Sequence, residues 1–215
     1  MFLGYLSEDP QFYFAIVITV VVSICVHELA HGIVAIRLGD RTPVESGHMT
    51  LNPLVHMGPM AIVFLLLAGI SWGSMPISPA RLRGRYAPAL VAAAGPASNV
   101  ALAVMALLAM GLWDRFDQRG VGQMPHALTN ARYLLGVFAY ANFALAMFNL
   151  IPVPPLDGWR ILANLSRSYQ RMVESPSAGG MMVVLLVVLL LGAGKVIAPL
   201  AAALVRQGLW LIRGY

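Results

Sequence analysis

Long apolar stretches, separated by short polar segments, make up most of the chain. A transmembrane helix needs about 20 mostly apolar residues, and the stretches of that length are residues 12–36, 87–113, 132–150 and 181–212. Lys195 and Pro199 interrupt the last one, which is therefore either one long span or a span followed by a shorter interfacial helix at about residues 204–212. The pattern predicts an all-α polytopic membrane protein, a bundle of about four to six transmembrane helices.

A fifth apolar block, residues 57–72, is shorter and contains Gly58, Pro59 and Gly69. Arginines flank it on both sides, at positions 37 and 41 before it and at 81, 83 and 85 after it. Because cytoplasmic loops are enriched in arginine, both groups lie in the cytoplasm only if the block does not cross the membrane. Charge therefore favours a re-entrant hairpin near residues 57–78, with the acidic N-terminus outside. Non-helical backbone at that depth must be buried in protein or line a wet cavity, so the hairpin predicts a water-accessible site.

The composition agrees with a membrane protein and restricts its function. Apolar residues make up 59% of the 215 residues and charged residues 11%, against about 45–50% and about 25% in soluble domains. We expect a single membrane domain over residues 1–215, in contact with the lipid bilayer and compatible with an oligomer. The net charge is +5, but the arginines stand singly or in pairs between apolar blocks. That arrangement indicates topology signals and not a nucleic-acid-binding surface.

The run His27-Glu28-Leu29-Ala30-His31 lies in the last third of the first apolar stretch. On a helix His27 and His31 project from one face, one turn apart, where both imidazoles can bind one metal ion. Glu28 lies beside them and can act as general base towards a water molecule activated by zinc. Ionisable residues within a membrane segment are expensive and functional by default. The spacing and the burial together predict a catalytic zinc site nearer the cytoplasmic end of this helix.

A catalytic zinc site usually has three protein ligands and an open position, so a third ligand must come from elsewhere. The candidates are Asp157, His48, His56, Glu45 and His126. Asp157 follows a segment with three prolines and precedes Gly158, and such a segment can direct a carboxylate into the bundle. The alternative is that Asp157 caps the following helix. The local sequence leaves these two interpretations open.

Four sequence elements, in this order along the chain, resemble those of one known family. They are Val26-His27-Glu28-Leu29-Ala30-His31-Gly32, Leu51-Asn52-Pro53-Leu54-Val55-His56, Ala94-Gly95-Pro96-Ala97-Ser98-Asn99, and residues 149–158. The chain is similar to the site-2 protease family of intramembrane metalloproteases, in particular to short prokaryotic members without a PDZ domain. The resemblance covers residues 20–165 approximately and departs from the family at Met57-Gly58, where an aspartate is frequent, and in a looser hairpin at residues 71–76.

The resemblance implies zinc, one ion per chain, bound by His27, His31 and Asp157, with Glu28 activating water. It also implies that Asn99, and less directly Asn149, lies near the metal and holds the substrate strand or the developing oxyanion, while His56 is a possible accessory residue. The implied activity is hydrolysis of peptide bonds in or near the transmembrane segments of other membrane proteins. An unwound substrate strand would add to the edge of the hairpin at residues 70–78. The alternative function is a metal-binding membrane protein, a transporter or scaffold, without hydrolysis.

Overall fold

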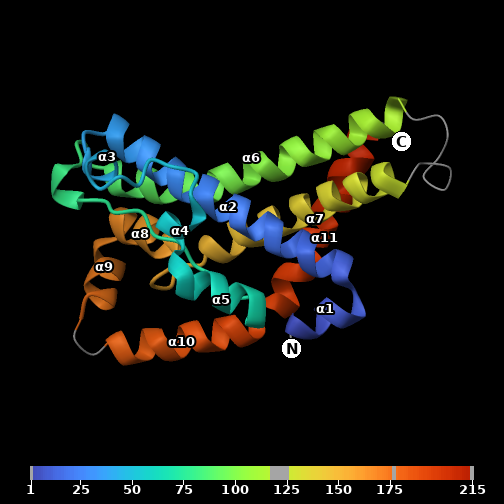
Figure 1. Ribbon diagram of the computed structural model, residues 1–215. Coiled ribbons are helices and arrows are strands. Elements are labelled where there is room, and N and C mark those ends of the chain that lie inside the picture. Colours follow the sequence, from blue (N-terminus) through green and yellow to red (C-terminus); the bar gives the residue numbers. More distant parts are fainter. Residues whose placement is uncertain (1, 117–125, 176–177, 214–215) are drawn as a thin grey trace.

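The computed structural model describes residues 2–116, 126–175 and 178–213, and within these ranges it contains helices and no strand (Figure 1). The α-helices are α1 (Tyr5–Glu8), α2 (Pro10–Arg37), α3 (Thr42–Glu45), α4 (Pro53–His56), α5 (Gly58–Ala68), α6 (Ala87–Phe116), α7 (His126–Asn149), α8 (Asp157–Leu165), α9 (Arg167–Val173), α10 (Ala178–Gly192) and α11 (Gly194–Arg213). Helix α6 is central, because it packs against α2, α7, α8 and α11. The main contacts of α10 are with α9 and α11, and it runs along the edge of the molecule (Figure 1).

Helix α2 has clear start and stop signals. Pro10 occupies its first turn, where a missing N–H costs nothing, and the Asp9 carboxylate accepts a hydrogen bond from the Phe12 N–H at 3.0 Å. At the other end Gly39 adopts a φ of 103°, a conformation that glycine enters without strain. These signals define a helix of 28 residues, long enough to cross a bilayer.

Helix α6 approaches α2 closely because small residues face it. The run Ala92-Ala93-Ala94-Gly95-Pro96-Ala97-Ser98 has no large side chain, and small residues let the backbones of membrane helices come together. Pro96 lies inside the helix and is tolerated because neighbouring helices surround it. The close approach allows a side chain of α6 to reach the polar groups of α2.

The predicted class, an all-α polytopic membrane protein, is confirmed. Helices long and apolar enough to cross a membrane are Pro10–Arg37, Ala87–Arg115, Thr129–Asn149 and Gly194–Arg213. The fourth predicted stretch is helical as expected, but its division differs from both alternatives: it forms two helices, α10 and α11, that meet at Ala193. The break falls between Gly192 and Gly194, which are weak helix formers, whereas Pro199 is accommodated inside α11.

The block at residues 57–72 forms α5, a helix of only 11 residues. At about 1.5 Å per residue it covers about half of a hydrocarbon core about 30 Å thick. It packs on α2 through a cluster of Ile24, Met57, Ala61 and Leu65. After Gly69, whose φ is 71°, the chain returns without helix through residues 70–78, here called the return segment. The two arms of the predicted hairpin are thus a short helix and an extended segment.

Candidate metal centre

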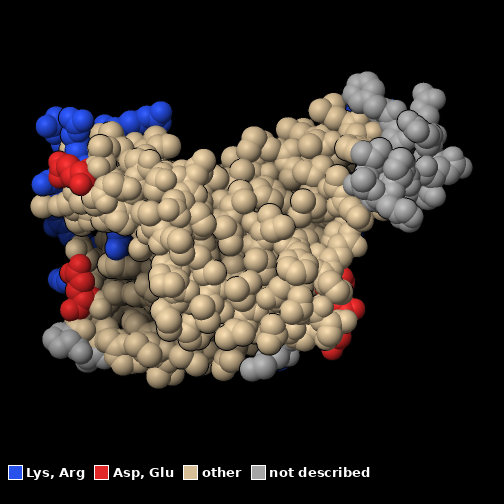
Figure 2. All heavy atoms as spheres, viewed as in Figure 1, with Lys and Arg blue, Asp and Glu red and all other residues tan. Residues whose placement is uncertain are grey.

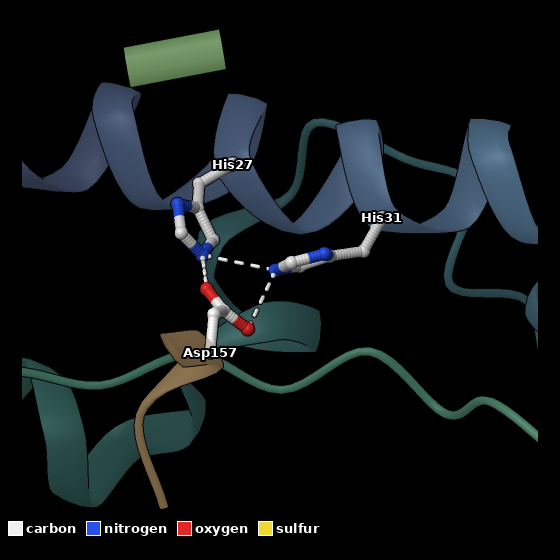
Figure 3. Close-up of side chains that lie close together, drawn as sticks. All are labelled: His27, His31 and Asp157. Atoms are coloured by element: carbon white, nitrogen blue, oxygen red, sulfur yellow. Dashed lines mark hydrogen bonds and ion pairs between the residues drawn. The ribbon is translucent and has the colours of Figure 1, made fainter. Parts of the chain in front are cut away.

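Two side chains from the C-terminal half of α2, His27 and His31, converge with one from the start of α8, Asp157 (Figure 3). The Nε2 atoms of His27 and His31 are 3.0 Å apart. Asp157 Oδ2 lies 3.0 Å from His27 Nε2, and Asp157 Oδ1 lies 3.3 Å from His31 Nε2. One ligand atom from each residue can be chosen so that all lie within 4.8 Å of one another. Both histidines are buried and Asp157 is partly buried.

Asp157 reaches the histidines because the chain between α7 and α8 is short and rigid. It contains Pro152, Pro154 and Pro155, and a side chain at Gly158 would overlap the backbone carbonyl of Leu150. The residue before α8 makes no side-chain cap bond, and Asp157 is the first residue of that helix. Its carboxylate is directed at the two histidines.

In the neutral form of each imidazole, the hydrogen bond on the far side of the ring places the proton on Nδ1 and leaves Nε2 without one. His31 Nδ1 lies 2.7 Å from the Val91 carbonyl oxygen, which can only accept, so the Nδ1 of a neutral ring carries the hydrogen. His27 Nδ1 lies 2.6 Å from the side-chain oxygen of Asn99. Within the described ranges Asp157 Oδ2 is buried without a hydrogen-bond donor. Lone pairs therefore face one another, an arrangement that a divalent cation stabilises.

Two glycines shape the space beside these ligands. A β-carbon at Gly95 would overlap the Nε2 atoms of both His27 and His31. One at Gly73, in the return segment, would lie 2.5 Å from Glu28 Oε1. The space in front of the imidazoles is kept open by the absence of a side chain on α6. Two imidazole nitrogens, a carboxylate and an open cradle fit the donor set of a catalytic zinc ion.

Glu28 lies in the wall of a pocket of about 420 Å³ that also contains the three converging residues. Trp72, Gly73 and Met75 of the return segment form part of the wall. Arg160 adds a positively charged side chain to it. Glu28 is buried. The pocket size lies in the range of small-molecule and peptide side-chain sites.

The other residues singled out in the sequence take different positions. Asn99 is buried and contacts His27. Asn149 lines the pocket, and its amide donates to the Leu145 carbonyl at 3.0 Å. His56 is buried behind the return segment: its Nε2 lies 2.6 Å from the Thr50 carbonyl, and its own carbonyl accepts from the Ser74 N–H at 2.9 Å.

Two other candidates for a third ligand whose side chains the structure describes, His48 and Glu45, are not part of the cluster. His48 Nδ1 contacts Ser46, and Glu45 forms an ion pair with Arg81. The side chain of His126 lies outside the described residues.

Sequence reasoning did not find Val91, Gly95 or Asn142. Asn142 is fully buried in α7 and accepts from the Asn99 amide at 2.9 Å. The available signal was a polar residue in an otherwise apolar span, which marks a functional position by default. Gly95 belongs to one of the elements that resemble the family, but the resemblance assigned it no role, and Val91 carried no signal. The roles of both depend on where α6 lies against α2.

A second buried carboxylate holds the end of the return segment. Asp40 accepts from the N–H and hydroxyl of Thr42, and its Oδ2 accepts from the Ser78 N–H at 2.6 Å. Burial alone would raise the pKa of Asp40, but these hydrogen bonds hold its pKa below the usual value. The segment is thus fastened to the loop after α2.

Two histidines and a carboxylate with converging lone pairs, next to a buried glutamate in a bundle of membrane helices, have the composition expected for the site of an integral-membrane metallohydrolase. A model of peptidase family M50 matches residues 13–193. A Bacillus subtilis protein named "Putative zinc metalloprotease YwhC" is 37% identical over 153 residues, 70% of this chain and 68% of the relative.

Two further relatives are named "Putative zinc metalloprotease Rip2". The one from Mycolicibacterium smegmatis is 28% identical over 196 residues, 84% of this chain and 71% of the relative. The one from Mycobacterium tuberculosis H37Rv is 30% identical over 166 residues, 73% of this chain and 60% of the relative. No solved structure matches the chain. The chain belongs to peptidase family M50, the site-2 protease family of intramembrane metalloproteases, which confirms the family and the enzyme class that the sequence predicted.

Proposed function

We propose that this chain hydrolyses peptide bonds in or near the transmembrane segments of other membrane proteins, at a zinc ion held by His27, His31 and Asp157. The observation that carries the proposal is the convergence of three lone-pair-bearing side chains beside the buried Glu28 in one pocket. When bound there, zinc polarises a peptide carbonyl and makes water a stronger acid. The names of the curated relatives, zinc metalloproteases, support the choice of metal.

Glu28 acts as general base and then as general acid. It is one residue from His27 and faces the pocket, so it can take a proton from the attacking water and pass it to the leaving amine. Asp157, an anion, completes the ligand set and reduces the net positive charge of the site. Asn149 lies in the pocket wall and is a candidate for contact with the substrate backbone.

The return segment is the surface on which we place the substrate strand. Within the described part of the chain, the backbone N–H groups of Ser74 and Ser78 are the ones between residues 71 and 78 that donate to protein acceptors. The others are free to pair with an extended peptide, the usual requirement for strand addition. A substrate helix must unwind to present a carbonyl, and pairing along this segment would satisfy its freed backbone groups.

The distribution of charge supports an active site nearer the cytoplasmic face. Figure 2 shows basic side chains gathered, with some acidic ones among them, at the end of the molecule where α3 lies, and acidic side chains near α1 at the opposite end. The exposed arginines of the first group include Arg37, Arg41, Arg81, Arg83 and Arg85. His27 and His31 lie in the half of α2 towards this end, and cytoplasmic loops carry the excess of arginine.

The decisive experiment is Glu28→Gln in the purified protein, reconstituted with zinc and a single-span membrane substrate. Cleavage should fall by about 10²- to 10⁴-fold, the usual contribution of a general base, while zinc content stays at the wild-type level. Glu45→Gln, a matched change at the end of α3 and outside the pocket, should cleave like the wild type. Cleavage by Glu28→Gln at the wild-type rate would contradict the role of Glu28. A wild-type protein that binds zinc and cleaves no membrane substrate would favour a metal-binding transporter or scaffold.

A further inference from the structure

We propose that Asn142 is a positioning residue that, acting through Asn99, fixes the proton of His27 on Nδ1 and keeps its Nε2 free for the metal. The inference rests on the proposed zinc site and extends it to a residue of α7 that does not touch the pocket. It concerns the direction in which two buried amides are oriented, which decides the tautomer of a ligand.

The chain of hydrogen bonds begins at a group whose role is certain. The Phe138 carbonyl can only accept, and Asn142 Nδ2 donates to it at 2.9 Å. The oxygen of the same amide therefore points the other way, where it accepts from Asn99 Nδ2 at 2.9 Å. That donation in turn places the oxygen of Asn99 towards His27, 2.6 Å from Nδ1. His27 must donate, and its proton lies on Nδ1.

The opposite orientation would exclude His27 from the metal. If the Asn99 amide were turned over, its N–H would face Nδ1, the ring would have to accept there, and its hydrogen would move to Nε2. A protonated Nε2 has no lone pair for zinc. Asn99 alone does not prevent this, since its two ends are nearly the same size. The side-chain oxygen of Asn142, which accepts from the Asn99 amide, makes one orientation of that amide more stable than the other.

The burial of both amides strengthens the preference for this orientation of Asn99. Asn142 and Asn99 are 0% and 1% exposed, so water cannot replace a lost partner, and a reversed amide would leave acceptors facing acceptors. Partners of ligand histidines of this kind typically affect metal affinity by about 10- to 100-fold. Here the partner of His27 is a pair of residues, Asn99 and Asn142, and their hydrogen bonds link α2, α6 and α7.

The test is a double-mutant cycle on zinc affinity, measured by competition with a chelating dye on the purified protein in detergent. Asn142→Leu should weaken zinc binding by about 10- to 100-fold. In an Asn99→Asp background the same change should not weaken zinc binding further, because both carboxylate oxygens accept and no longer need the oxygen of Asn142 to orient them. Asn142→Asp, in the protonated form that its full burial favours, can still donate to the Phe138 carbonyl and accept from Asn99, and should bind zinc within a few-fold of the wild type. Thr19→Val, which removes another fully buried polar group of a membrane helix, is the control and should bind zinc normally.

The outcomes separate this inference from the proposed function. Wild-type zinc affinity in Asn142→Leu, or an equal loss in the Asn99→Asp background, would overturn the positioning role, because a purely structural role would show no rescue. Asn142→Ala repeats the cycle with a smaller side chain if leucine prevents folding. A wild-type protein that binds no zinc would instead contradict the metal site itself. The absorption spectrum of the cobalt-loaded protein provides a second readout, expected to change in Asn142→Leu and to return in the double variant.

Discussion

Two carboxylates in this protein are each contacted by two basic side chains, with opposite consequences. Asp157 faces His27 and His31 at 3.0 and 3.3 Å. Asp114, in the last turns of α6, accepts from Arg132 of α7 at 2.9 Å and from Arg213 of α11 at 3.0 Å. Both clusters join segments that are distant in sequence. We refer to them as the Asp157 cluster and the Asp114 cluster.

The difference lies in what the basic groups offer. A guanidinium has five N–H donors and no acceptor, so every contact in the Asp114 cluster pairs a donor with an acceptor and the cluster is complete. The imidazoles of the Asp157 cluster have used their N–H groups on the Val91 carbonyl and the Asn99 oxygen, and they present lone pairs to a carboxylate. One cluster holds three helices together; the other is complete only with a cation.

The largest expected effect comes from removing each carboxylate in turn. Asp157→Ala should weaken zinc binding by more than about 100-fold, the upper cost of losing an outer partner, and abolish cleavage. Asp114→Ala should keep zinc and lower the free energy of unfolding by about 1–3 kcal/mol, between the values for exposed and buried ion pairs. Zinc content and thermal unfolding in detergent, with and without a chelator, measure both. The chelator should lower the Tm of the wild type and of Asp114→Ala but not that of Asp157→Ala; equal responses of all three would contradict the comparison.

A smaller loss is expected from filling the space in front of the imidazoles. Gly95→Ala places a β-carbon against both Nε2 atoms, and the displacement of ligands that follows should weaken zinc binding and cleavage by about 10- to 100-fold. Gly136→Ala in α7 is the matched control, since its β-carbon would meet only Met110 at 3.7 Å, and it should bind zinc normally. Normal zinc affinity in Gly95→Ala would show that the metal does not occupy this space.

The sequence predicted those parts of the molecule that depend on local pattern. The span of α2, the spacing of His27 and His31 and the break before Asp157 all follow from residues within a few turns of one another. Asn142 and Asn99 are 43 residues apart, and Asn99 and His27 are 72 apart. Their partnership requires the packing of α6 between α2 and α7, which no periodicity encodes. The break at Ala193 was not predicted, because the pattern indicated Lys195 and Pro199 as the interruptions of this stretch, whereas the break follows from the weak helix propensity of Gly192 and Gly194.

A third carboxylate, that of Asp40, extends the comparison with Asp157 and Asp114, and we expect its substitution to have the smallest effect. Asp40 is complete without a cation, because the backbone N–H groups of Thr42 and Ser78 donate to it, and its pKa is lowered by these bonds against the effect of burial. A lowered pKa means that its stabilisation is fully present above the ordinary value of about 3.9 and is lost as the pH falls through the lower, folded-state pKa. Asp40→Asn should therefore reduce the free energy of unfolding by about 1 kcal/mol at neutral pH, and the difference from the wild type should shrink below about pH 4. Thermal unfolding from pH 3 to 7 measures this difference. Thr42→Val, which removes the hydroxyl donor to Asp40, should show part of the same effect.

Zinc content is the control and should stay at the wild-type level in Asp40→Asn at neutral pH. The Asp40 carboxylate stabilises the return segment by accepting hydrogen bonds and contributes no lone pair to the metal. A pH-independent difference would mean that Asp40 acts through packing and not through its charge.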